Sequence, residues 1–160
     1  MENDEKLTLV QAHEKFAKSL NGKTWDLLGK AKRTLDEDEL MVLTASASLY
    51  HWLQIGTVVN AQRSEWLLAR VYTVLEKPHP AMEHALRCQE LTDANLSEMK
   101  DFDVAYSYEA LARMYALREE TSKANKYLDL ARQKGKRIAD PEDRSIFMDD
   151  LEGEPWFGLG

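Results

Sequence analysis

Two segments of this sequence carry the same pattern of small, aliphatic and aromatic residues, and this repetition restricts the fold more than any other feature. The first set is Leu68-Ala69, Tyr72, Ala81, Ala85 and Cys88, and the second is Leu111-Ala112, Tyr115, Ala124, Leu128 and Ala131. Each member of the first set lies 43 positions before its counterpart. Small residues recur where two helices cross closely, and the Tyr lies one turn further along, where it can fill a gap between helix pairs. The repetition predicts two similar helical hairpins in tandem.

The composition agrees with a single helical domain. The 160 residues are 44% hydrophobic, enough for a chain of this length to bury roughly 70% of its unfolded surface around one core. Seven Gly and four Pro are too few for a many-stranded sandwich or barrel, which needs a turn about every 8–12 residues. No convincing period-two alternation is present. We therefore expect an all-α fold of seven or eight helices joined by short turns.

Apolar residues at helical spacing, together with caps and breakers, set the expected limits of these helices. The dipeptide Asn21-Gly22 predicts the end of the first helix, and a run of four acidic residues at 36–39 predicts the start of another. Two prolines, Pro78 and Pro80, separate a further pair. The expected helices are 6–20, 24–34, 36–55, 60–76, 80–93, 102–118, 122–134 and 141–151.

The segment 60–135 resembles the tetratricopeptide repeat family, whose motif combines small and aromatic residues in this order. A degenerate third copy begins with Trp25-x-x-Leu28-Gly29, which looks like the start of the family's motif, and continues with Ala45, Leu49 and Trp52. The resemblance implies a short right-handed solenoid of stacked antiparallel hairpins. Its expected parts are a single domain at 1–151, built on the pairs 24–55, 60–93 and 102–135, and a tail at 152–160.

Two departures from the family pattern stand out. A family unit has about 34 residues, so the 43-residue offset adds nine, most easily placed in 92–101. The closing proline of the motif is missing from both good copies. The alternative to the repeat is an unrelated helical bundle with Ala-rich crossings.

In the tetratricopeptide family the first helix of each hairpin lines a concave groove that binds peptides of partner proteins. Helical geometry places Arg63, Trp66 and Arg70 of helix 60–76 on that side, together with Tyr106, Glu109 and Arg113 of helix 102–118. The basic residues Lys30 and Arg33 of the degenerate copy lie on the same side. The resemblance thus implies a basic, aromatic groove. Its candidate binding residues are Arg63, Trp66, Arg70, Tyr106, Glu109, Arg113, Lys30 and Arg33.

Such a groove predicts a non-enzymatic adaptor that binds an acidic peptide or another anionic ligand. Neither Arg63 nor Arg70 has an acidic partner within its own helix, and a guanidinium group suits a carboxylate or phosphate. The alternative is that Asp103 or Glu109 of the next hairpin pairs with these arginines, so that the stripe only holds hairpins together. Glu109 and Arg113, four residues apart, fit a bridge on the helix surface.

Two other functions stay open. One is a structural protein that forms a homodimer through an open end of the short solenoid, because terminal repeats need caps. The other is a small-molecule-binding or catalytic protein with a pocket near His51, Arg63, Glu65 and His84. The sequence contains none of the familiar nucleophile, phosphate-binding or metal-ligand motifs, so we expect no enzyme activity, cofactor or metal.

Charge and the chain's ends favour a cytoplasmic protein. The net charge of −7 argues against general binding of nucleic acid. No apolar run reaches the 18 residues of a membrane-spanning helix, and the N-terminal segment lacks the pattern of a signal peptide. We therefore expect neither nucleic acid nor membrane as a partner. The single cysteine, Cys88, lies on an apolar helical face and is expected to be a buried structural thiol.

The acidity is concentrated at the C terminus. Residues 140–160 hold seven acidic residues and one basic residue, a local charge of −6, which leaves −1 for residues 1–139. The tail also contains Pro155-Trp156-Phe157, an aromatic and anionic combination that a basic groove would accept. We expect residues 152–160 to dock on the protein itself or on a neighbouring copy. The alternative is that Trp156 and Phe157 only cap the last helix.

Overall fold

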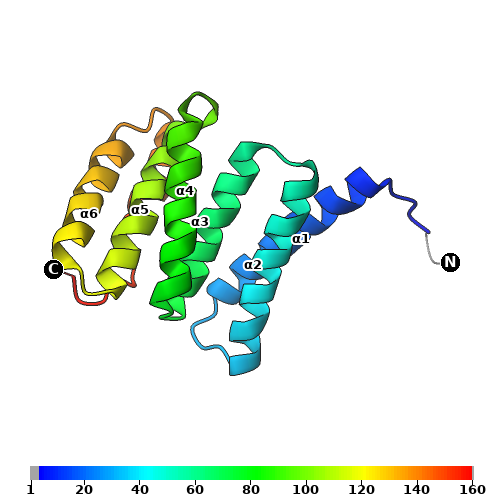
Figure 1. The fold of residues 1–160 in the computed structure, drawn as a ribbon, viewed down its shortest axis with the longest axis horizontal. Helices are drawn as coiled ribbons and strands as arrows, with labels where there is room; N and C mark the ends of the chain where they lie inside the picture. The colour runs from blue at the N-terminus through cyan, green and yellow to red at the C-terminus, as the bar shows by residue number, and fades with distance from the viewer. Residues whose placement is uncertain (1–3, 160) are drawn as a thin grey trace.

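A computed structural model describes residues 4–159, and this part of the chain is all-helical, without a strand (Figure 1). The helices are α1 (Leu9–Leu28), α2 (Leu35–Ile55), α3 (Val58–Val74), α4 (Pro78–Ala94), the 3₁₀ turn η1 (Leu96–Glu98), α5 (Asp101–Leu117), α6 (Thr121–Lys136) and α7 (Pro141–Glu152). The predicted all-α fold class is confirmed.

The helices form three antiparallel hairpins, α1/α2, α3/α4 and α5/α6, which follow one another across Figure 1 from the N-terminal to the C-terminal end. Each hairpin packs on the next one in the chain, and α3 also packs directly against α5. The last helix, α7, packs against both α5 and α6. The predicted stack of hairpins is thus confirmed, with α7 as an extra helix at its C-terminal end.

The sequence repeat reappears in the backbone of the turns. Glu76 and Glu119, which are 43 positions apart, both adopt left-handed backbone angles, with φ of 55° and 61°. The amide after each of them donates to the carbonyl of the repeated tyrosine, Tyr72 at 2.9 Å and Tyr115 at 3.0 Å. The second and third hairpins therefore turn in the same way.

The repeat also appears in the side-chain packing. Tyr72 stacks on His84 and Tyr115 stacks on Tyr127, each with ring centroids 5.6 Å apart. His84 and Tyr127 again lie 43 positions apart. The small residues at the helix crossings are all buried, namely Ala69, Ala81, Ala85, Ala112, Ala124 and Ala131. Close approach of the paired helices depends on these small side chains.

Cys88 occupies one of the same crossings. It is a free and fully buried thiol, as predicted. Burial raises the pKa of the Cys88 thiol, and this disfavours the thiolate that a nucleophile needs.

The helix boundaries at the N-terminal end differ from the prediction. The expected helices 6–20 and 24–34 are one continuous helix, α1, and residues 29–34 form the turn that follows. Gly22 lies exposed inside this helix, and Thr24 just beyond it is buried, with its hydroxyl 2.8 Å from that of Thr44 on α2. Packing against α2 therefore overrides the weak helix propensity of Asn21-Gly22.

The extra residues of the repeat lie only partly in the predicted segment 92–101. Only residues 95–100, including η1, separate α4 from α5, and the segment 92–94 is still helical. The helices of the second hairpin have 17 residues each. The longer unit is thus built partly from longer helices.

Gly135 lets α7 approach α6. A Cβ atom at this position would lie 2.4 Å from Cε1 of the fully buried Phe147. We expect Gly135→Ala to lower the free energy of unfolding by about 1–3 kcal/mol through overpacking. Urea denaturation measures the change. The matched control is Gly22→Ala, where no atom lies within 4 Å and the better helix former should add about 0.5–1 kcal/mol. Equal effects of the two substitutions would contradict this packing.

Candidate functional site

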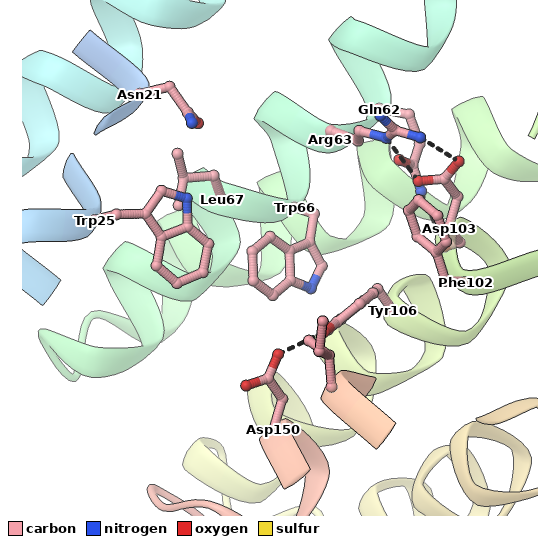
Figure 2. A pocket seen from close by; sticks show the side chains of 11 residues that line it. Asn21, Trp25, Gln62, Arg63, Trp66, Leu67, Phe102, Asp103, Tyr106 and Asp150 are labelled. Carbon is pink, nitrogen blue, oxygen red and sulfur yellow. Dashed lines mark hydrogen bonds and ion pairs between the residues drawn. The ribbon is translucent and has the colours of Figure 1, made fainter. Parts of the chain in front are cut away.

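The first helices of the three hairpins and α7 enclose a cavity of about 480 Å³ (Figure 2). Its walls are mostly apolar and aromatic. They include Trp25 from α1, Trp66 from α3, Phe102 and Tyr106 from α5, and Ile146 from α7. Apolar cavities with a few polar groups are the usual form of ligand sites.

The aromatic rings form a continuous series from α1 to α7. Trp25 stacks on Trp66 with centroids 5.8 Å apart, and Trp66 meets Tyr106 edge to face at 5.2 Å. Tyr106 meets the buried Phe147 edge to face at 4.7 Å. Trp25 is 43% exposed and Ile146 51%. These two side chains therefore offer apolar surface at the accessible side of the cavity.

Asp150 of α7 fixes the orientation of Tyr106. The Tyr106 hydroxyl donates to Oδ2 of Asp150 at 2.5 Å (Figure 2). Burial and this acceptor raise the pKa of Tyr106, so the phenol stays a neutral donor near pH 7. The hydrogen bond ties the α7 wall to α5.

Arg63 is paired with the next hairpin. Its Nε and Nη2 donate to the two carboxylate oxygens of Asp103 at 2.8 and 3.1 Å, a bidentate pair that Figure 2 shows at the edge of the cavity. The Asp103 side chain is 2% exposed, whereas that of Arg63 is 44% exposed. The guanidinium also lies over the ring of Phe102, with Cζ 5.0 Å from the centroid. Arg63 thus joins α3 to α5 and still reaches the surface.

The buried carboxylate of Glu109 interacts with three side chains from two helices. This carboxylate is 2% exposed, accepts the indole N–H of Trp66 at 2.8 Å, and lies 3.3 Å from Nη1 of Arg70. Nε of Arg113 also donates to it. Arg63 and Arg70 therefore both pair with the next hairpin, as the alternative interpretation of these arginines proposed. Asp103 and Glu109 therefore compensate most of the arginine charge that was expected to await a ligand.

Arg113 is not the surface bridge that the sequence suggested, because it is only 1% exposed. Its guanidinium donates to the backbone carbonyls of Asp150, Gly153 and Pro155 at 2.6, 2.8 and 2.9 Å. It also lies 4.1 Å from the centroid of the Trp156 ring. Burial lowers the pKa of Arg113, which nevertheless stays charged at neutral pH. Arg113 therefore anchors the C-terminal segment.

The described part of the tail, up to residue 159, packs on its own chain. Trp156 is 8% exposed, and its indole N–H donates to the carbonyl of Leu151 at 2.9 Å. The tail thus both docks on the protein and covers the end of α7, which combines the two expectations. It is held by backbone carbonyls on Arg113 rather than by acidic side chains in the aromatic cavity.

Lys30 and Arg33 lie in the turn between α1 and α2 rather than on a groove-lining helix. Lys30 pairs with Glu37, and Arg33 donates to Asp38 at 2.8 Å. Lys30 also lowers the pKa of Glu37. Both basic residues thus act at the N-terminus of α2 and do not line the aromatic cavity.

The residues of the alternative pocket are separated. Glu65 and His84 form a contact of 2.6 Å between α3 and α4. His51 instead lies 2.8 Å from His13 of α1 through their Nδ1 atoms, and Arg63 faces α5. Within residues 4–159, no group of three His, Cys, Asp or Glu side chains is arranged to hold a metal.

The sequence pattern did not place several residues of the cavity wall, among them Trp25, Phe102 and Ile146. Of these three, only Trp25 stood out in the sequence, as part of the repeat motif. The available signal for Trp25 and Phe102 was that both are aromatic residues on the first helix of a hairpin. Ile146 carries no local signal, because its place depends on how α7 packs on α5.

A second, polar cavity of about 210 Å³ adjoins the first, and Asn21 and Arg63 line both. The other side chains of this polar cavity are Lys18, Trp52, Asn60 and Ser64. No carboxylate is among its lining residues, and several hydrogen-bond donors are. The pair of cavities therefore offers apolar and donor-rich surfaces side by side.

Comparison of the chain with protein-family models, with characterised protein sequences and with solved structures finds no match. The resemblance to the tetratricopeptide family therefore stays a prediction that rests on the residue pattern. In the described residues, no helix is long and apolar enough to span a membrane.

The anchoring role of Arg113 is testable by Arg113→Lys. Lysine keeps the charge but lacks the planar fork that reaches three carbonyls and a carboxylate. We expect a loss of about 2–4 kcal/mol in the free energy of unfolding, together with faster proteolysis of residues 152–159. Arg87→Lys is the control, because Arg87 is exposed on α4 and does not line the cavity beside the tail. A tail that stays protected in Arg113→Lys would contradict the anchor.

Proposed function

We propose that this chain is a non-enzymatic, tetratricopeptide-like adaptor that binds a peptide segment of a partner protein across α1, α3, α5 and α7. The observation that carries the proposal is the aromatic cavity between these helices. Its ring series is fixed by hydrogen bonds behind the surface, so the site is formed before a ligand arrives. Preformed aromatic surfaces bind apolar side chains with little loss of conformational entropy.

The chemistry of the two cavities defines the expected peptide. The aromatic cavity suits one large apolar side chain, packed between Trp25 and Ile146. The adjoining polar cavity suits a carboxylate, because Asn21 and the remaining N–H groups of Lys18 and Arg63 can donate there and no acidic side chain lines it. Lys18 also pairs with Glu14, and Arg63 with Asp103. The preferred ligand is therefore an apolar residue with an acidic residue close by.

Charge reversal at Arg63 or Arg70 is a poor test of this site. Each reversal would place a new carboxylate beside a buried one, Asp103 or Glu109, and each of these is only 2% exposed. A buried charge without its partner costs about 3–5 kcal/mol. Lost binding could then reflect lost folding, so the test variants must come from the exposed part of the wall.

Trp25→Ala is the sharper variant, because its ring is partly exposed and stacks only at the edge of the series. Twelve-residue peptides selected from a phage-displayed random library serve as the probe, with affinities measured by fluorescence anisotropy. We expect selected peptides to share an apolar residue next to an acidic one, and Trp25→Ala to weaken them at least about tenfold, as for an interface hot spot.

Leu96→Ala is the matched control, since Leu96 is 57% exposed on η1, away from both cavities. It should leave the affinity unchanged. Selected peptides that bind Trp25→Ala as tightly as the unmodified protein would refute the site. Failure to enrich any peptide would also count against the proposal.

A further inference from the structure

Exposed large hydrophobic side chains are concentrated on the first hairpin. Eleven such side chains are exposed in the described residues, and nine of them lie before residue 56. The remaining two are Leu96 and Ile146. Single exposed apolar residues are normal, but a cluster of them indicates an interaction surface.

The second helix of this hairpin also lacks charge. No Asp, Glu, Lys or Arg occurs from residue 40 to residue 62, although 31% of the whole chain is charged. On α2 the residues Leu43, Tyr50 and Leu53 share one helical face and are 64%, 58% and 62% exposed. Depletion of charge together with exposed aromatic and aliphatic side chains is typical of the core of an interface.

The two helices of the hairpin join in one patch around a histidine pair. The Nδ1 atoms of His13 and His51 are 2.8 Å apart. Phe16 lies 5.5 Å from the His51 ring and Tyr50 lies 6.4 Å from the His13 ring, measured between centroids. Phe16 is 49% exposed. We call the surface formed by Phe16, Tyr50, Leu53 and these histidines the N-terminal patch.

The outer surface at the opposite end of the stack, on α6, is polar instead of apolar. The exposed residues of α6 are polar or charged throughout, and they include five basic residues, Lys123, Lys126, Arg132, Lys134 and Lys136. In addition, α7 and the anchored tail cover part of the last hairpin. Repeat stacks need polar outer faces at their ends. This chain has one at α6 and lacks one at the N-terminal patch.

We propose that the N-terminal patch is covered by the same patch of a second copy, which makes a two-fold symmetric homodimer. Head-to-head pairing brings two apolar surfaces together, and none of the five residues that define the patch carries a fixed charge. Head-to-tail pairing would press the apolar patch against the basic α6 and remove its charged side chains from water, which is costly. A two-fold interface also closes the assembly at two copies, whereas head-to-tail contacts would continue into filaments.

A membrane surface suits the patch less well. Helices that lie on membranes carry a polar face rich in Lys and Arg. The α2 half of the patch has neither from Leu40 to its end, and on α1 Lys15 and Lys18 are paired with Glu5 and Glu14. The proposal is also independent of the peptide site, because Trp25 lies on the opposite side of α1 from Phe16. Trp25→Ala should therefore dimerise like the unmodified protein.

Sedimentation velocity on the full chain, between about 1 μM and about 1 mM, tests the dimer over the range of weak and moderate affinities. We expect the unmodified protein to shift from monomer to dimer as its concentration rises. The double variant Tyr50→Glu/Leu53→Glu should stay monomeric over the same range, with an unchanged circular dichroism spectrum. Leu96→Glu, an equally exposed position outside the patch, should dimerise normally.

Symmetric cross-linking gives a second readout that does not depend on the charged variant folding. Leu53→Cys should form an intermolecular disulfide at least about tenfold faster than Leu96→Cys under mild oxidation, because only the former faces its own copy. The native Cys88 is fully buried and does not interfere. A monomer at all concentrations, growth beyond the dimer, a dimer that survives Tyr50→Glu/Leu53→Glu, or equal cross-linking would overturn the proposal. Association with liposomes by the monomer would do so too.

Discussion

The hydrogen bonds and ion pairs of the Glu109 carboxylate are the interactions on which the rest of the structure depends. This carboxylate accepts the indole N–H of Trp66, pairs with Arg70 of α3 and Arg113 of its own helix, and is almost fully buried. A charge in that position is tolerable only when it is paired and hydrogen bonded. The relative position of α3 and α5 is therefore fixed by chemistry as well as by apolar packing.

The same network extends to the end of the chain. Nε of Arg113 donates to Glu109, and its two terminal nitrogens donate to three backbone carbonyls, those of Asp150, Gly153 and Pro155. The carbonyl of Asp150 also accepts the amide of Gly153 at 3.2 Å, so the buried guanidinium joins the last turn of α7 and the tail to α5. Because α7 supplies one wall of the aromatic cavity, the cavity depends on this anchor. Stability and the candidate site thus share the same residues, and a change at Arg113 cannot affect one without the other.

The fold was largely predictable because its pattern is local and repeated. Small residues at fixed spacing, prolines and acidic first turns marked most helices within a few residues. The error at Asn21-Gly22 arose because local propensity is weak compared with the packing of Thr24 against Thr44. Tertiary contacts decide such cases, and a single sequence does not display them directly.

The candidate site was predictable only in part, because its partners lie in different hairpins. A search within one helix left Arg63 and Arg70 without acidic partners, yet Asp103 and Glu109 lie 40 and 39 positions further on. Those separations are close to the repeat length of 43, so residues on the facing sides of neighbouring first helices should be paired once a repeat is recognised.

This pairing changes what the charge of the chain means for binding. The sequence suggested that arginines of the groove await an anionic ligand, but buried carboxylates of the same chain already satisfy most of that charge. What is left accessible is an aromatic wall with one half-exposed guanidinium and a neighbouring set of donors. Apolar burial must then supply most of the affinity, while the donors select for an acidic neighbour in the ligand. A groove built in this way should depend less on ionic strength than a basic one, because its charges are compensated before the ligand binds.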